Sequence, residues 1–218
     1  LPESYIGSPL GLLISEKRVL SAPLFNKPAL VFTDEGVDIK RVNCSKGICV
    51  SRGTVSVEFP QDQYNTTAVA NKSAYFDLMY DKEEVEGKGR TIVRLAGNVI
   101  KEIIETKENE RVKIIPVGLT LAFEKNTFPK DWQVDDEVEL KIYGLENINH
   151  AVEAGPKLID TEKICIDMEL EGWKRQNSIK TQAARLDYTD MRGPKITAGI
   201  DKVGNVVVLA INGRIRES

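Results

Sequence analysis

Hydrophobic and polar residues alternate with a period of two along most of the chain, which is the pattern of half-buried β-strands. Pairs of alternating segments separated by turn residues predict β-hairpins. The later segments 111–123 and 135–145 predict single strands, the second of them with one face in water. The predicted hairpins occupy residues 11–23, 29–42, 47–59, 90–104, 155–170 and 195–211.

Helical patterns are few. Residues 146–155 predict a short helix that ends at Gly155, and residues 177–189 predict one or two helical turns after a polar cap. The chain has 218 residues, enough for one large domain with a substantial core. We therefore expect a single β-rich domain over residues 1–218, with mostly antiparallel sheets and few short helices.

Composition and charge exclude several functional classes. The formal charge of −3 gives no general signature of polyanion binding, so nucleic acid is not an expected partner. The longest apolar run, 206–211, is the length of a strand and far below the roughly 20 residues that span a bilayer. No basic segment precedes an apolar one in residues 1–15, so this stretch is not expected to be a signal peptide.

Three cysteines leave two alternatives open. Cys44 and Cys49 could face each other across a hairpin turn and form a disulfide, or they could be reduced, half-buried thiols like Cys165. No histidine accompanies them at zinc-ligand spacing, so a metal site on the cysteines is not expected. Asp and Glu are plentiful, and a structural divalent cation such as calcium stays open as a cofactor.

Four residues attract attention as candidate ligands of a sugar. His150 is the only histidine and is either structural or a hydrogen-bond donor to a substrate. Glu153 lies just before Gly155 and Pro156, where a glycine allows close backbone approach to a ligand. The alternative for this segment is an ordinary turn.

The segment 167–175 contains Glu169 and Glu171, which share one side if the segment is extended. Paired carboxylates serve glycoside hydrolysis, in which one group protonates the leaving oxygen and the other attacks or activates water. Trp173 could stack on a sugar face. The alternative is a pair of glutamates on a solvated strand.

Cations lie at both ends of the last predicted hairpin. If its strands are adjacent and antiparallel, Lys195 and Arg214 fall near the same end of the sheet. Arginine binds phosphate with two parallel hydrogen bonds and lysine binds it as a point charge, so the pair could clamp one phosphate. The alternative is two ordinary cations at strand ends.

Several of these segments together resemble the phosphodiester glycosidase family. The resemblance rests on AGPKLI at 154–159, EGW at 171–173 and KITAGIDKVGNVVVLAINGR at 195–214, in that order. Segments 7–32, 89–103, 114–123 and 135–142 extend it over most of the chain. The family pattern has Arg where this chain has Lys195, and Asp-Gly-Arg where this chain has Asn212, Gly213 and Arg214.

The resemblance implies an α+β fold with a binding cleft at strand ends. It also implies a secreted, extracellular hydrolase that cleaves a sugar 1-phosphodiester, such as a phosphodiester of N-acetylglucosamine. Two further family motifs, expected before Leu1 and after Ser218, are missing, which predicts a fragment without its flanking segments. The expected partner is a glycan or a sugar phosphate, and the oligomeric state is not predicted.

The resemblance also assigns roles to individual residues. Lys195 and Arg214 would bind the phosphate, with Thr197 and Ser218 as nearby hydroxyl donors. Glu171, Asn212 and Arg214 would form the catalytic group, and Gly155 with Pro156 would shape the wall of the sugar pocket beside His150, Glu153 and Trp173. An amide at position 212 cannot act as a general base. A non-catalytic carbohydrate-binding or cell-wall-binding relative is therefore the alternative.

Overall fold

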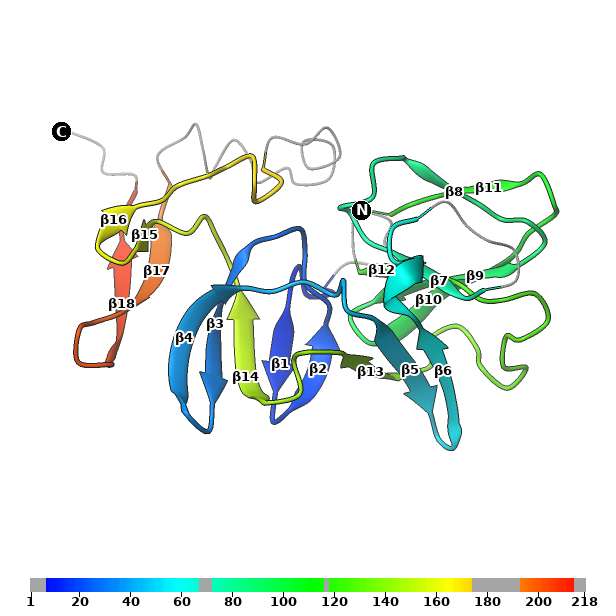
Figure 1. The fold of residues 1–218 in the computed structure, drawn as a ribbon, viewed down its shortest axis with the longest axis horizontal. Coiled ribbons are helices and arrows are strands. Elements are labelled where there is room, and N and C mark those ends of the chain that lie inside the picture. The colour runs from blue at the N-terminus through cyan, green and yellow to red at the C-terminus, as the bar shows by residue number, and fades with distance from the viewer. Residues whose placement is uncertain (1–6, 67–71, 116–117, 174–192, 214–218) are drawn as a thin grey trace.

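The computed structural model describes residues 7–66, 72–115, 118–173 and 193–213 (Figure 1). Strands dominate them, and every ladder is antiparallel. The strands of the first half are β1 (Leu13–Ser15), β2 (Arg18–Ser21), β3 (Pro28–Thr33), β4 (Gly36–Arg41), β5 (Ile48–Arg52), β6 (Val55–Phe59), β7 (Ala74–Phe76), β8 (Glu84–Glu86) and β9 (Thr91–Ala96). Those of the second half are β10 (Val99–Glu105), β11 (Arg111–Lys113), β12 (Leu119–Ala122), β13 (Glu139–Ile142), β14 (Ile148–Glu153), β15 (Ile159–Asp160), β16 (Lys163–Ile164), β17 (Lys195–Ile200) and β18 (Val206–Ile211).

The largest sheet has eight strands in the order β4-β3-β14-β1-β2-β13-β5-β6. A second sheet has the order β10-β9-β12-β7. The main hydrophobic cluster draws side chains from both sheets, including Ile48 and Leu140 from the first and Val93, Leu95 and Leu121 from the second. The two sheets therefore bury their apolar faces against each other, which is the arrangement that alternating strands favour.

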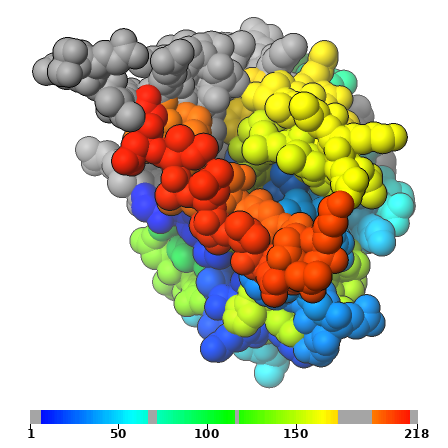
Figure 2. Space-filling model, turned by 90° about the vertical axis from the view of Figure 1, so that its left-hand side faces the viewer, coloured from blue at the N-terminus to red at the C-terminus, as the bar shows by residue number. Residues whose placement is uncertain are grey.

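Three two-stranded ladders complete the described part of the chain: β8 with β11, β15 with β16, and β17 with β18. In Figure 1, β15 to β18 lie beyond β4 at one end of the large sheet. Figure 2 shows the β17–β18 hairpin lying across that end of the molecule, next to β15 and β16. This hairpin contacts β4 and otherwise exposes most of its apolar side chains.

The hairpin predictions are confirmed for residues 11–23, 29–42, 47–59, 90–104, 155–170 and 195–211, each of which contains an antiparallel strand pair. Strand β13 alternates exposed and buried residues, so the predicted wet face is also confirmed. In the hairpin of β5 and β6, the turn is at Gly53 and Thr54, one residue later than expected.

The α+β prediction is wrong for the described residues, whose only helix is the three-residue 3-10 helix η2 (Gln61–Gln63). The helix predicted over 146–155 is instead strand β14, which pairs with β3 on one side and β1 on the other. Two strand partners satisfy its backbone groups, and this tertiary pairing outweighs the weak helical pattern. The helix predicted over 177–189 lies outside the described residues.

The cysteines are free thiols. Cys44 is fully buried, and its Sγ atom donates to Asp77 Oδ2 at 3.4 Å. Asp77 also accepts hydrogen bonds from the Tyr64 hydroxyl at 2.7 Å and the Asn65 side-chain amide at 2.7 Å. Burial, together with the neighbouring Asp77 carboxylate, raises the pKa of Cys44 well above its usual value, so this thiol is part of a structural network.

Candidate functional site

Glu171 is the centre of a buried polar cluster. Its carboxylate has no exposed surface and forms an ion pair with Arg41, whose Nη1 atom lies 2.6 Å from Oε1. The backbone N–H of Lys157 donates to the same oxygen at 2.9 Å. The indole Nε1–H of Trp173 donates to Oε2 at 3.1 Å. Three donors from three separate segments therefore hold this carboxylate in one place.

A compact turn, rather than an extended segment, points Glu171 inward. The Asp167 side chain accepts the backbone N–H of Leu170 at 2.8 Å, and the backbone N–H of Gly172 donates to the carbonyl of Glu169 at 3.0 Å. Glu169 is consequently exposed while Glu171 is buried. The prediction that both glutamates share one side of an extended segment is wrong, because the turn replaces the alternation of a strand.

The Gly155–Pro156 segment passes directly over this carboxylate. Its peptide bond is cis, and Gly155 has a φ of +158°. A β-carbon at Gly155 would lie 2.8 Å from Glu171 Oε2 and 3.5 Å from a ring carbon of Trp173. The absence of a side chain at Gly155 therefore makes room for the side chains of Glu171 and Trp173, and the predicted approach to a ligand stays a prediction.

Glu153, at the end of β14, is a second buried carboxyl group. Its Oε2 atom accepts the backbone N–H of Leu24 at 2.8 Å and also that of Leu12. Its Oε1 atom is buried and has no hydrogen-bond partner among the described residues. Burial raises the pKa of Glu153 to about 8, against the opposing effect of the two backbone donors and of Lys27. The protonated carboxyl is thus the main form at neutral pH.

Lys27 lies close enough to Glu153 and Glu171 for the charges of both to act on it. It precedes β3, is buried, and places its Nζ atom 4.0 Å from the centre of the Trp173 ring. Burial lowers the pKa of Lys27, whereas the charges of Glu153 and Glu171 raise it. We call Lys27, Arg41, Glu153, Glu171 and Trp173 the carboxylate cluster.

Sequence reasoning identified Glu153, Glu171 and Trp173 of this cluster and missed the two cations. Lys27 does lie in the segment 7–32, which is part of the family resemblance. Arg41 ends β4 in an ordinary alternating pattern, and nothing in the sequence distinguishes it. Its role depends on the pairing of β4 at the edge of the sheet, which only the tertiary structure fixes.

The predicted role of Trp173 in stacking on a sugar does not fit its surroundings. The indole is only 5% exposed, and the ammonium of Lys27 covers its ring. Its nitrogen is engaged with Glu171. Trp173 is therefore placed to position the carboxylate.

The last hairpin holds the predicted phosphate ligands that the structure describes. Lys195 pairs in register with Ile211, which places Asn212 at the same end of the hairpin. Lys195 and Thr197 are both half-buried, and Asn212 is exposed. The hairpin contacts β4, the strand that carries Arg41. The predicted partners Arg214 and Ser218 lie outside the described residues.

The side chain of His150 points to solvent, away from the carboxylate cluster. It is exposed on β14, whereas Glu153 of the same strand is buried. Its Nδ1 atom accepts the backbone N–H of Glu16 at 3.4 Å, in the turn between β1 and β2. The structure therefore gives His150 a contact with a surface turn and does not bring it to the other candidate residues.

Two surface pockets lie away from the cluster. One, of about 520 Å³, follows β6, and the other, of about 300 Å³, lies beside β13. Within the described parts of the chain, no group of three or more His, Cys, Asp or Glu side chains is arranged to hold a metal ion. The described residues also contain no helix with the length and apolar character needed to cross a membrane.

Comparisons with known proteins leave the family of this chain open. No protein-family model and no curated protein matches the sequence. One solved structure, described as a hypothetical protein from Synechocystis, is similar with a TM-score of 0.45 and 16% sequence identity. The similarity covers 93% of this chain and 37% of that protein, so the chain spans little more than a third of the length of the protein it matches.

Proposed function

We propose that this chain is a phosphodiester glycosidase domain that cleaves a sugar 1-phosphodiester, such as one of N-acetylglucosamine. The observation that supports this proposal is the convergence of Glu153, Gly155, Glu171 and Trp173 in one buried cluster. These residues were selected from the sequence as parts of a sugar site, and they lie close together although they come from two separate segments.

The two carboxyl groups differ in the way that acid catalysis of glycoside cleavage requires. Glu153 keeps its proton at neutral pH because its pKa is about 8, whereas Glu171 is ion-paired with Arg41. Pairs of carboxyl groups in contrasting environments are typical of glycosidases. In the proposed reaction, water adds to the anomeric carbon and the bond from that carbon to the phosphate oxygen breaks. Glu153 gives its proton to that oxygen, and Glu171 stabilises the positive charge on the sugar. The proton lost by the attacking water then returns to the Glu153 carboxylate.

Two lysines are suited to bind the phosphate in this proposal. Lys27 is within the carboxylate cluster, and Lys195 is at the end of the hairpin that contacts β4. A phosphate beside Glu153 would be favoured by such charges. The exposed amide of Asn212 is available as a hydrogen-bonding group, in line with its inability to serve as a base.

One observation favours the alternative of a non-catalytic carbohydrate-binding relative. Both oxygens of Glu171 are occupied by donors from the protein, and the side chain has no exposed surface. A carboxylate in this state can be purely structural, holding the Gly155–Pro156 segment and Trp173 in place.

The test is an assay of N-acetylglucosamine release from its methyl 1-phosphodiester, with binding of the same compound followed by thermal shift. We expect release by the unmodified chain, loss of release in Glu153→Gln and Glu171→Gln, and retention in Glu169→Gln. Glu169 is the matched control because it lies on the same turn and is exposed. Binding without release supports the carbohydrate-binding alternative. The absence of both sugar release and thermal stabilisation would contradict both proposals.

A further inference from the structure

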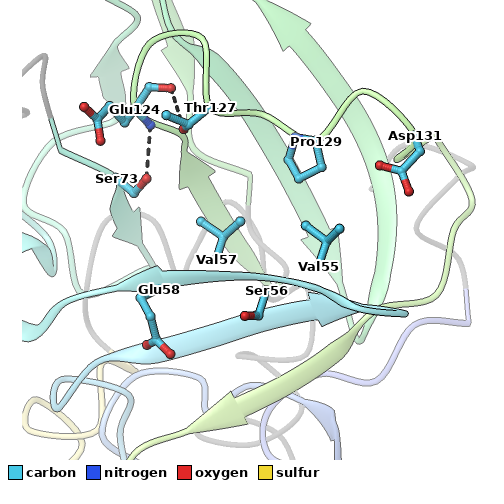
Figure 3. Close-up of a pocket in the computed structure, with 9 residues that line it drawn as sticks. All are labelled: Val55, Ser56, Val57, Glu58, Ser73, Glu124, Thr127, Pro129 and Asp131. Carbon is cyan, nitrogen blue, oxygen red and sulfur yellow. Dashed lines mark hydrogen bonds between the residues drawn. The ribbon is translucent and has the colours of Figure 1, made fainter.

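A groove of about 520 Å³ runs along the outer edge of the large sheet (Figure 3). One side of it is formed by Val55, Ser56, Val57 and Glu58 of β6, and the other by the loop 124–131 together with Ser73. Successive side chains of a strand point to opposite faces. A groove lined by four consecutive residues must therefore follow the edge of the strand and not only one of its faces.

The backbone along this edge is available for pairing. Strand β6 is the last in its sheet and pairs only with β5. Arg52 and Val55 face each other across the two-residue turn, and such flanking residues exchange both of their backbone hydrogen bonds. By alternation, Val55, Val57 and Phe59 bond to β5, while the N–H and C=O groups of Ser56 and Glu58 point outward.

Strand β6 also lacks the features that usually protect an edge. Its sequence VSVEF contains no lysine or proline, and its register with β5 is regular, without a bulge. The opposite edge of the same sheet differs, because β4 carries Lys40 and Arg41 and is contacted by β17. The contrast between the two edges indicates that the edge of β6 is kept open.

The acidic residues that line the groove favour a basic ligand. Glu58, Glu124 and Asp131 line it, and none of the residues that line it is a lysine or arginine. Asp131 has an exposed side chain whose one ion-pair contact, with Arg52, is a distant 3.9 Å. In Figure 3, Val55 and Val57 point toward the loop that carries Glu124 and Asp131, whereas Glu58 points to the opposite face of β6. There the Glu58 carboxylate accepts the hydroxyl of Tyr143 at 2.8 Å.

We propose that β6 is a docking edge for an extended segment of a partner protein that carries alternating basic and apolar side chains. The segment adds to the eight-stranded sheet as a ninth strand, paired to the outward backbone groups of Ser56 and Glu58. Its apolar side chains lie on the face of Val55 and Val57, and its Lys or Arg side chains lie on the face of Ser56 and Glu58. Glu124 and Asp131 add negative charge at the other side of the groove. This site is remote from the carboxylate cluster and does not depend on the proposed glycosidase activity.

The experiment uses the complete chain and a fluorescent acetylated Lys-Val-Lys-Val-Lys-Val amide peptide, with binding followed by anisotropy. We expect this peptide to bind, and the matching Glu-Val peptide not to bind. A Lys-Val peptide with N-methylated alternate amides should also fail, because it cannot pair with the edge. Amide hydrogen exchange should show slower exchange at Ser56 and Glu58 when the Lys-Val peptide is present.

Three variants separate backbone pairing from charge. Ser56→Pro removes an outward N–H that β5 does not use, so binding should be lost. Asp131→Lys should weaken binding about tenfold. Glu35→Lys, an equal charge reversal in the exposed turn between β3 and β4 at the opposite edge of the sheet, should leave it unchanged. If Ser56→Pro does not fold, Asp131→Lys and the hydrogen-exchange data still test the proposal.

Several results would overturn the proposal. They are equal binding of the Lys-Val and Glu-Val peptides, binding that Asp131→Lys and Glu35→Lys weaken equally, and full binding by folded Ser56→Pro. Self-association of the chain through β6, seen as exchange protection at Ser56 that rises with protein concentration and no peptide binding, would replace the partner with a second copy.

Discussion

Glu153 and Glu171 show how position decides the chemistry of identical side chains. Glu171 has donors on both oxygens, including the guanidinium of Arg41. Glu153 has backbone donors on one oxygen and none on the other. A buried carboxyl group without a full set of donors is more stable with its proton, and this explains the pKa of about 8 for Glu153.

The raised pKa of Glu153 makes the stability of the protein depend on pH. Its folded pKa of about 8 is above the ordinary value of 4.5, so its stabilising contribution is complete below pH 4.5 and is lost as the pH rises through 8. Between pH 4.5 and 8, the unfolding free energy of Glu153→Gln should fall less steeply with pH than that of the wild type. The difference in slope should be up to roughly 1.4 kcal/mol per pH unit. Urea unfolding at several pH values measures this slope. Glu169→Gln should keep the wild-type slope, and an unchanged slope in Glu153→Gln would contradict the assignment.

At the scale of elements, the loop that joins β8 to β9 depends on one buried arginine. Arg90 has no exposed surface, and its guanidinium donates to the carbonyls of Glu86 at 2.9 Å, Gly87 at 3.1 Å and Lys72 at 3.4 Å. Burial lowers the pKa of Arg90. The side chain thus provides donors to carbonyl groups at the end of β8, in the β8–β9 connection and at Lys72.

We therefore expect Arg90→Met to lower the unfolding free energy by about 3 kcal/mol, because buried carbonyls lose their donors. Arg18→Met is the matched control. Arg18 is exposed and paired with Glu137 at 2.9 Å, and loss of such a surface pair should cost less than about 1 kcal/mol. Thermal and urea unfolding of the two variants give the comparison. Equal losses in both would show that Arg90 is not the internal support of this loop.

At the scale of the whole molecule, the β17–β18 hairpin is unlike the packed sheets. Strand β18, VVVLAI, is exposed along its full length, and Ile196 of β17 is 79% exposed (Figure 2). An uninterrupted apolar strand is typical of one covered on both faces. Exposed apolar strands at a sheet edge favour association.

The hairpin should make the chain associate as its concentration rises. Val207→Lys combined with Leu209→Lys, on one face of β18, should shift the sedimentation profile toward the monomer. The melting temperature should stay nearly unchanged because both side chains are more than half exposed. Val134→Lys, at an exposed site elsewhere, serves as the control. A wild-type chain that is monomeric at every concentration would contradict this expectation.

The sequence by itself determined the strands and most hairpin turns, because a period of two and local turn residues are properties of neighbouring positions. It also selected Glu153, Gly155, Glu171 and Trp173. The tertiary structure decided what depends on distant segments: that 146–155 is the strand β14, that Lys27 and Arg41 join the cluster, and that His150 does not. Strand pairing and burial arise between residues more than a hundred positions apart, as between Arg41 and Glu171, and no local pattern encodes them.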